Sequence, residues 1–135
     1  MIANFRGILI HFYINFCFWL NPNIDVVSRV QIKDRPIIDI RNGAKLIVEE
    51  NVTLNSRNRT YHVNMFAPVK ILAKISGAVV KIGANTRIHG SCIHAQNSII
   101  IGSNCLIAAN CQIMDGSGHS LDPDNRLETT TEGTP

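Results

Sequence analysis

An aliphatic residue recurs at intervals of six along much of the chain, and this spacing restricts the fold more than any other feature. The leading aliphatic residues are Val48, Ile82, Ile88, Ile101, Ile107 and Ile113. Four positions after each of them stands a small or slim side chain: Val52, Thr86, Cys92, Cys105, Cys111 and Ser117. Neither the helical period of about 3.6 residues nor simple strand alternation repeats in this way. Short flat strands joined by tight corners do, so we predict an all-β parallel coil built from hexapeptide repeats.

The same frame predicts the corners and the stacking order of the coil. Residues that tolerate unusual backbone angles fall between the strands: Gly83, Asn85, Gly102 and Asn104. We expect Val48, Ile82 and Ile101 to point inward and to stack on one another. The 19 residues from Ile82 to Ile101 make three units of six plus one. This length predicts three-sided coils with one inserted residue near Ile93 to Ala95.

The repeat also accounts for three of the four cysteines. Cys92, Cys105 and Cys111 fall on the slim inward position, where a thiol acts as a small apolar group, so we expect them to be reduced and buried. No Cys-x-x-Cys pair is present, which disfavours a zinc knuckle. Cys17 lies in the apolar N-terminal segment, and nothing in the pattern demands an oxidising compartment.

Composition limits the class of protein. The chain has 135 residues, of which 45% are hydrophobic and 17% are charged. These values predict one folded domain and exclude both a disordered tail and a two-domain enzyme. The net charge is only +3, and no block of Lys and Arg concentrates it. We therefore expect no nucleic-acid partner.

Residues 5–20, FRGILIHFYINFCFWL, form the most apolar segment. His11 and Asn15 are four positions apart and would share one polar stripe of a helix. We predict a helix within residues 3–20, in an N-terminal segment of residues 1–23. The apolar stretch is too short to span a membrane. Packing on the body of the protein, anchoring at a membrane surface and a cleaved signal stay open, although no small-x-small cleavage site follows.

We assign residues 24–135 to the coil domain, with regular coils from about Ile37 onward. Two segments interrupt the repeat. Residues 55–68, NSRNRTYHVNMFAP, are polar and predict a loop expelled from a corner. From Met114 to Pro135, glycine, proline and threonine end the periodicity. Loops on a rigid scaffold are where binding and catalytic residues concentrate.

The stretch from Ile101 to His119, IGSNCLIAANCQIMDGSGH, resembles the hexapeptide-repeat acyltransferases. It is most similar to the branch that acetylates sugars and cell-surface polysaccharides, which includes the maltose and galactoside acetyltransferases. The resemblance covers about residues 36–135. It implies a left-handed parallel β-helix, acetyl-CoA as the donor substrate, no metal, and a homotrimer with active sites between subunits. It also implies a cytoplasmic location, with peripheral membrane contact through residues 5–20 if that segment is an anchor.

The resemblance assigns the catalytic base to His119. A neutral imidazole would take the proton from a sugar hydroxyl as it attacks the thioester, and the imidazolium would then protonate the departing thiolate. His119 also follows Ile113 by six residues, where the repeat predicts another aliphatic residue. Asp115 would either orient this imidazole or hold the loop by binding backbone amides, and both roles stay open.

The resemblance also gives expectations for the two substrates. Arg57, Arg59 and Tyr61 in the expelled loop would contact the acceptor, with a merely solvated loop as the alternative. In the family, most contacts to coenzyme A come from coils that follow the histidine loop. We therefore expect the residues that bind coenzyme A beyond residue 135, and we expect the chain to be a fragment or a degenerate copy.

Two other functions compete with acyl transfer. His89 and His94 have a spacing that also occurs in the zinc sites of γ-class carbonic anhydrases, but only His62 is available upstream as a third ligand. The second alternative is a non-catalytic β-helix that serves as a scaffold. His119 argues against a scaffold, because it stands where an aliphatic residue would stabilise the coil better.

Overall fold

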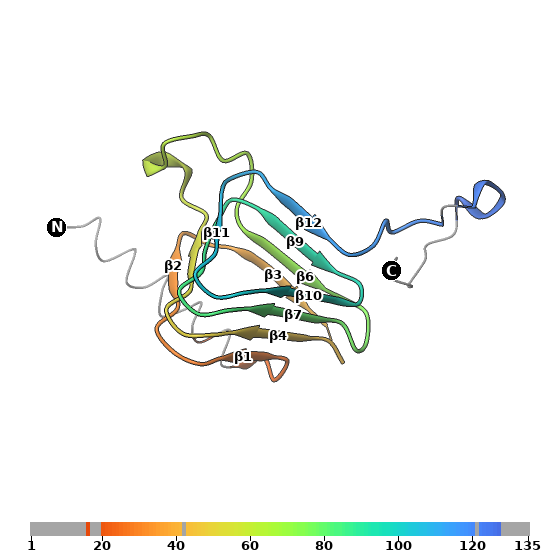
Figure 1. Cartoon of the computed structure of the whole chain (residues 1–135), viewed down its shortest axis with the longest axis horizontal. Coiled ribbons are helices and arrows are strands. Elements are labelled where there is room, and N and C mark those ends of the chain that lie inside the picture. The colour runs from red at the N-terminus through yellow and green to blue at the C-terminus, as the bar shows by residue number, and fades with distance from the viewer. Residues whose placement is uncertain (1–15, 17–19, 42, 121, 128–135) are drawn as a thin grey trace.

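The computed structural model shows a three-sided coil of parallel strands (Figure 1). The residues that it describes are 16, 20–41, 43–120 and 122–127. The N-terminal helix predicted within residues 3–20 lies almost entirely outside the described residues. Within the described part of the chain, no helix is long and apolar enough to cross a membrane.

Each side of the coil is a four-stranded parallel sheet. Sheet A contains β1 (Ile24–Val26), β4 (Lys45–Val48), β7 (Val79–Ile82) and β10 (Ser98–Ile101). Sheet B contains β2 (Gln31–Lys33), β5 (Thr53–Asn55), β8 (Arg87–His89) and β11 (Leu106–Ile107). Sheet C contains β3 (Ile37–Ile40), β6 (Lys70–Ala73), β9 (Cys92–Ala95) and β12 (Gln112–Met114). Two short 3-10 turns lie outside the sheets: η1 (Asn58–Thr60) and η2 (Pro123–Asn125).

Consecutive strands belong to different sheets, and each strand pairs in parallel with the strand three places further along. The described chain therefore winds through stacked coils of three strands, which confirms the predicted parallel β-helix. The first coil begins at Ile24, earlier than the regular coils that the repeat predicts from about Ile37. The hexapeptide spacing does extend into this coil, because its inward residues Val26, Ile32 and Ile38 are six positions apart. They pair with Val48, Leu54 and Ile71 of the next coil, although sequence reasoning missed them.

The leading aliphatic residues stack as the sequence predicts. Val48 pairs with Ile82, and Ile82 pairs with Ile101. The stacked side chains of the two middle coils are fully buried: Leu46, Val48, Leu54, Ile71, Val80, Ile82, Ile88 and Ile93. Burying one such side chain contributes about 1.5–3 kcal/mol, so this interior column is the main source of stability.

Asparagine turns the chain at many of the corners. Four of these residues have φ angles between +57° and +68°: Asn51, Asn85, Asn104 and Asn110. Asparagine adopts this left-handed conformation more readily than other non-glycine residues. Gly83 is needed for a different reason. A Cβ at this position would lie 2.6 Å from the backbone of Gly102 in the next coil, so the two coils approach too closely for any side chain.

The corner between β8 and β9 is one residue shorter than the repeat predicts, and this changes the position of Cys92. Ile88 and Ile93 are five positions apart instead of six, yet both belong to the core. Cys92 therefore points outward, and Ser91 fills the slim inward position. The insertion predicted near Ile93 to Ala95 is also displaced, because β9 runs unbroken through these residues and the added length lies before β10.

Cys105 and Cys111, the other two cysteines predicted to lie in the core, are next to hydroxyl groups of the preceding coil. Thr86 Oγ1 accepts a hydrogen bond from the N–H of Cys105 at 3.1 Å, and Ser91 Oγ accepts one from the N–H of Cys111 at 3.0 Å. Each hydroxyl thus ties one coil to the next. Cys105 and Cys111 are only half-buried, because the described residues place no further coil above them. The prediction of fully buried thiols is therefore wrong for all three, although each is free of any disulfide.

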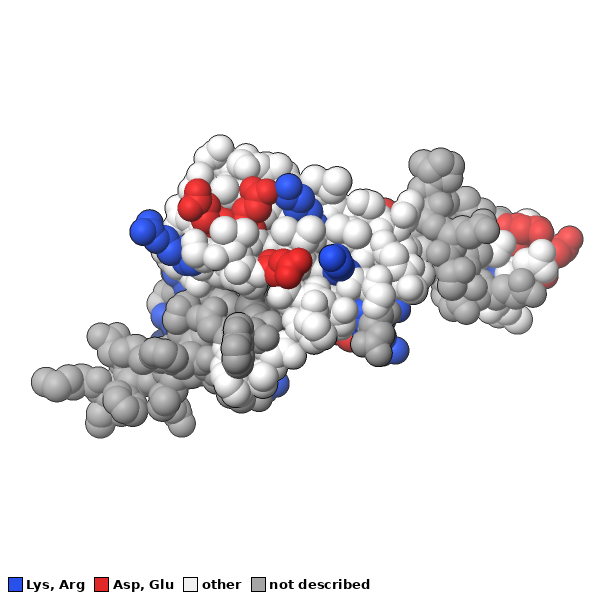
Figure 2. All heavy atoms as spheres, turned by 90° about the horizontal axis from the view of Figure 1, so that it is seen from below, with Lys and Arg blue, Asp and Glu red and all other residues white. Residues whose placement is uncertain are grey.

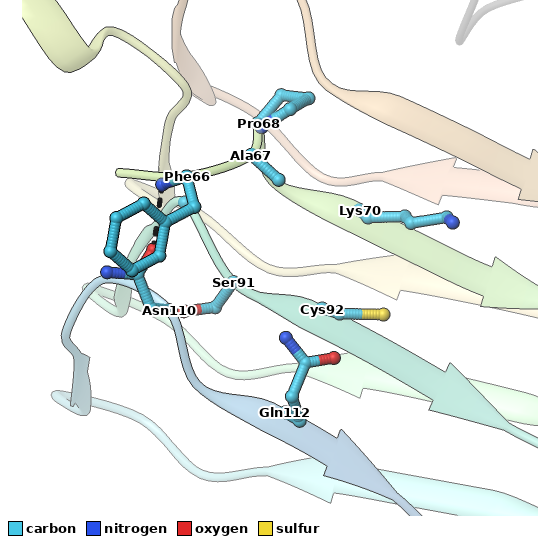
Figure 3. A pocket seen from close by; sticks show the side chains of 9 residues that line it. Phe66, Ala67, Pro68, Lys70, Ser91, Cys92, Asn110 and Gln112 are labelled. Carbon is cyan, nitrogen blue, oxygen red and sulfur yellow. Dashed lines mark hydrogen bonds between the residues drawn. The ribbon is translucent and has the colours of Figure 1, made fainter. Parts of the chain in front are cut away.

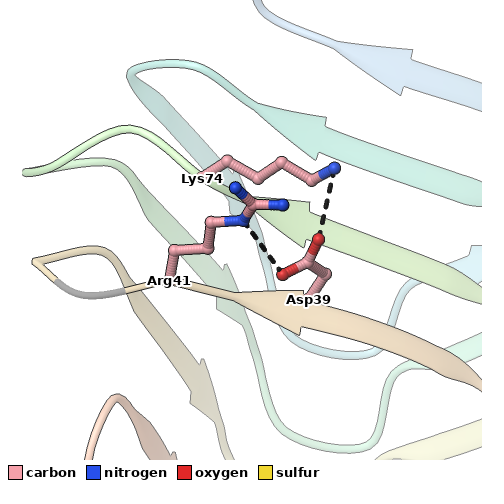
Figure 4. Close-up of polar contacts among 3 residues, drawn as sticks. All are labelled: Asp39, Arg41 and Lys74. Carbon is pink, nitrogen blue, oxygen red and sulfur yellow. Dashed lines mark hydrogen bonds and ion pairs between the residues drawn. The ribbon is translucent and has the colours of Figure 1, made fainter.

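Charged side chains pair on the outer surface. Asp39 lies 3.2 Å from Lys74 Nζ and 3.5 Å from Arg41 Nε (Figure 4). Burial alone would raise the pKa of Asp39, but hydrogen bonds from Lys74 and Arg41 bring it below its ordinary value. Figure 2 shows acidic and basic side chains close together on the face seen from below. Exposed pairs of this kind add little to stability.

Candidate functional site

The loop that follows β12 is fixed to the coil by Asp115. The two carboxylate oxygens of Asp115 accept hydrogen bonds from the backbone N–H groups of Gln96 at 2.6 Å, Asn97 at 2.8 Å and Ser98 at 2.6 Å. Burial alone would raise the pKa of Asp115, but these three bonds lower it. Because both oxygens are occupied by backbone amides, the contacts support the loop-holding role of Asp115 and not the orientation of an imidazole.

Gly116 continues this anchorage. The side chain of Gln96 is only 7% exposed and lies directly against Gly116. A Cβ at Gly116 would overlap the side-chain oxygen of Gln96, so a larger residue at this position would require the Gln96 side chain to move. The start of the loop is therefore set by two contacts, the Asp115 carboxylate and the close approach of Gly116.

His119 lies four residues beyond Asp115 on this loop and is exposed. Its backbone carbonyl accepts a hydrogen bond from the hydroxyl of Ser117, which shapes the turn. In the described part of the chain, no residue forms a hydrogen bond with its imidazole. The ring nitrogens of His119 are thus accessible to a ligand, while the start of its loop is tied to the coil through Asp115.

The expelled loop (residues 55–68) lies elsewhere. Figure 1 shows this loop and the segment after β12 on opposite sides of the coil. Tyr61 is stacked on the imidazole of His89, with ring centroids 4.6 Å apart and an angle of 22° between the ring planes. Arg57 and Arg59 are exposed. Within one chain, the predicted acceptor residues are therefore not brought together with His119.

His89 is held in its neutral form at the base of the expelled loop. Asn55 Oδ1 accepts a hydrogen bond from the N–H of Arg57 at 3.0 Å, which fixes the orientation of the Asn55 amide. Its Nδ2 then donates to His89 Nδ1 at 3.0 Å, so Nδ1 must be the unprotonated nitrogen. His89 is 8% exposed, and burial is the first cause of its lowered pKa. Nearby positive groups lower the pKa of His89 further: Arg87, Lys33 and His62.

A hollow of about 240 Å³ opens on the outer surface beside sheet C (Figure 3). Its floor includes a row of three side chains in register, Lys70 of β6, Cys92 of β9 and Gln112 of β12. Phe66 of the expelled loop forms a wall and is 86% exposed. Sequence reasoning missed this hollow because it forms where a loop meets two corners. The only available signal was Phe66 itself, an aromatic residue in a polar segment.

The histidines of the zinc alternative do not form a common site. His89 lies on β8 in sheet B, whereas His94 lies on β9 in sheet C. His62 lies beside Tyr61, with ring centroids 4.4 Å apart. Among the residues that the structure describes, no group of three His, Cys, Asp or Glu side chains is placed to hold a metal ion.

Comparison with protein-family models, with curated proteins and with solved structures found no match for this chain. The fold and the contacts above are therefore the basis for a functional proposal. His119 and His89 offer different chemistry, because the imidazole of His119 is accessible and that of His89 is buried and bonded. An accessible imidazole can exchange a proton with a ligand, whereas a buried and bonded one cannot do so without losing its hydrogen bond.

Proposed function

We propose that this protein is an O-acyltransferase that moves an acetyl group from acetyl-CoA to a hydroxyl of a sugar or polysaccharide precursor. His119 is the general base. One observation carries the proposal: Asp115 ties the start of the loop to the coil through three backbone hydrogen bonds, while His119 is exposed at the other end of that loop. The resemblance of residues 101–119 to the hexapeptide-repeat acyltransferases supports the same assignment.

The chemistry needs a positioned base because a sugar hydroxyl is a poor nucleophile at neutral pH. The neutral imidazole of His119 accepts the hydroxyl proton as the oxygen attacks the thioester carbonyl. The C–S bond then breaks, and the imidazolium returns the proton to the departing thiolate, so the products are an ester and free coenzyme A. An anchored loop lowers the cost of holding the imidazole in line with the hydroxyl.

The proposal extends to handedness, assembly and location. We propose a left-handed coil and a homotrimer, and the family resemblance supports both. Large apolar side chains point outward from the three strands of the last described coil: Ile100, Leu106 and Met114. These side chains are available to a neighbouring copy. A cytoplasmic location, with membrane contact through residues 5–20, agrees with the free thiols of Cys92, Cys105 and Cys111.

Replacement of the base tests the proposed function. Acetyl transfer by the full-length protein to a panel of sugars is followed through the free thiol of released coenzyme A. We expect His119→Ala to lower kcat by about 10²- to 10⁴-fold with a much smaller change in acceptor KM, because a general base acts mainly in the transition state. His94→Ala is the matched control and should keep most of the turnover. Near-normal turnover in His119→Ala, or its loss in His94→Ala, would contradict the assignment.

A scaffold is the second candidate, and the end of the coil favours it. The inward-facing residues Ile101, Ile107 and Ile113 are only partly buried in the last described coil. An apolar coil end of this kind suits stacking against another surface. A scaffold has no need of the donor, so equilibrium dialysis of the full-length protein with labelled acetyl-CoA separates the two candidates. Saturable binding supports the enzyme, and its absence supports the scaffold.

A further inference from the structure

We propose that the hollow beside Phe66 binds a cyclic hydroxy acid, meaning a sugar that carries a carboxylate. The ring packs on Phe66, the carboxylate lies at the ammonium of Lys70, and a hydroxyl meets the amide of Gln112. The proposal rests on the proposed function only in taking this compound as the acyl acceptor, which would have to meet His119 of a neighbouring copy, because the expelled loop and the segment after β12 lie on opposite sides of one coil. Binding itself needs neither acetyl-CoA nor His119.

The aromatic wall of the hollow is held in place by its backbone. The N–H of Phe66 donates to Asn110 Oδ1 at 2.9 Å, and Asn110 Nδ2 donates to the carbonyl of Asn64 at 2.8 Å. The preceding residue, Met65, is buried against Gly90, where any Cβ would collide with it. The segment is thus fixed while the ring of Phe66 stays 86% exposed. A rigid aromatic face beside a hollow offers a platform for the C–H face of a pyranose ring.

The charge of the hollow selects an anion. Lys70 is half-buried, and among the described residues no carboxylate lies within ion-pair distance of it. None of the residues that line the hollow is acidic. An ammonium group in this setting forms its strongest hydrogen bonds with a carboxylate or phosphate. Figure 3 shows the ammonium of Lys70 and the ring of Phe66 pointing apart, so the ligand must present its anionic group away from its ring face.

The remaining polar groups select hydroxyls. The single proton of Ser91 Oγ lies between the carbonyls of His89 and Ala108, and the oxygen accepts from the N–H of Cys111, so this hydroxyl offers little to a ligand. The amide of Gln112, in contrast, forms no hydrogen bond with any described residue and offers both donors and an acceptor. A ligand hydroxyl can accept a hydrogen bond from the amide nitrogen of Gln112 or donate one to its amide oxygen. An inorganic anion lacks the ring, and an aromatic acid lacks the hydroxyl, whereas a sugar acid supplies all three groups.

A nuclear magnetic resonance titration of the ¹⁵N-labelled full chain tests the proposal with three probes. Glucuronate has the ring, the hydroxyls and the carboxylate, glucose lacks the carboxylate, and benzoate lacks the hydroxyls. We expect glucuronate to shift the amide signals of Ala67, Lys70 and Gln112. We also expect its Kd to be lower than that of glucose or benzoate by about tenfold or more.

Variants assign the binding to the hollow. Lys70→Gln and Phe66→Ala should each weaken glucuronate binding by about tenfold, whereas Lys45→Gln, an exposed lysine on β4 in sheet A, should leave the Kd unchanged. Equal affinity for the three probes, no binding of glucuronate, or equal binding by all variants would overturn the proposal. If a variant fails to fold, the ranking of the three probes with the unmodified chain still decides.

The outcomes also separate this site from the proposed function. If glucuronate binds as expected but no acetyl group is transferred to any sugar, the site stands and the acyltransferase proposal fails. If acetyl groups are transferred while glucuronate does not shift the signals of the hollow, this proposal alone fails. His119→Ala should keep full glucuronate affinity, because His119 is outside the hollow.

Discussion

The imidazole of His89 is buried and faces a hydrogen-bond donor, and both features oppose its protonation. Its Nδ1 faces the amide donor of Asn55, and that amide cannot turn over without losing its bond to Arg57. A proton on Nδ1 would therefore place two donors against each other. Since Tyr61 is stacked on the same ring, a movement of the imidazole away from Asn55 would also disturb the attachment of the expelled loop.

We expect the free energy of unfolding to fall as the pH drops below the ordinary imidazole pKa of about 6.5. The pKa of His89 is lower in the folded than in the unfolded chain, so the unfolded chain binds more protons as the pH falls. Urea unfolding at about pH 7.5 and about pH 5.5 measures the difference. His89→Gln should reduce this pH dependence, and His62→Gln should keep it. An unchanged pH dependence in His89→Gln would refute the idea.

At the scale of elements, no strand of this coil is stable by itself. The strands have two to four residues, which is short for any β-structure. Each one is held by parallel pairing with the strands above and below and by inward side chains that stack across the coils. The loss of one inward side chain is consequently felt by three coils at once.

Ile88→Ala tests this dependence. Ile88 is fully buried in β8 between Leu54 and Ile107 of the adjacent coils. We expect the free energy of unfolding to fall by about 2–5 kcal/mol, because the deletion leaves a cavity that the neighbouring coils cannot fill. Val27→Ala, at a position that is 65% exposed, should change it by less than about 0.5 kcal/mol. Similar losses in urea unfolding of the two variants would argue against a stacked interior.

The success of sequence reasoning also varied by element. Inward aliphatic residues such as Ile82 and Ile101 could be predicted because stacking imposes a period on the sequence. Cys92 could not, because a corner one residue short moves the next side chain to the opposite face of the strand. The sequence alone does not decide between the two roles of Asp115. That choice depends on which backbone amides the fold brings near its carboxylate. The hollow beside Phe66 depends on contacts between distant segments and has no local pattern.

At the scale of the whole molecule, the last described coil presents a large apolar side chain on each of its three faces. Ile100, Leu106 and Met114 are all more than half exposed, one on each sheet. Monomeric proteins tolerate single exposed apolar side chains, but several on one coil favour contact with another copy. This arrangement agrees with a proposed homotrimer.

We expect sedimentation velocity to give a mass about three times that of one chain, with association driven by burial of apolar surface. Leu106→Glu should shift the population toward monomers, because it places a charge at an interface that would exclude water. Glu50→Gln, a change at an exposed turn, should leave the distribution unaltered. A single monomer peak for the unmodified protein over a wide concentration range would contradict the trimer.

The expelled loop leaves the coil after β5 and returns at β6, and the ladder of sheet C continues across it without a shift. Ile38, Ile71 and Ile93 remain directly stacked, although the connections that separate them in the chain differ in length. The stacking of the coils therefore depends on the order of the strands and not on the number of residues between them. Segments of quite different size and composition can be exchanged at this corner while the rest of the architecture is inherited unchanged. New surface recognition can in this way be acquired at one corner of an otherwise invariant framework.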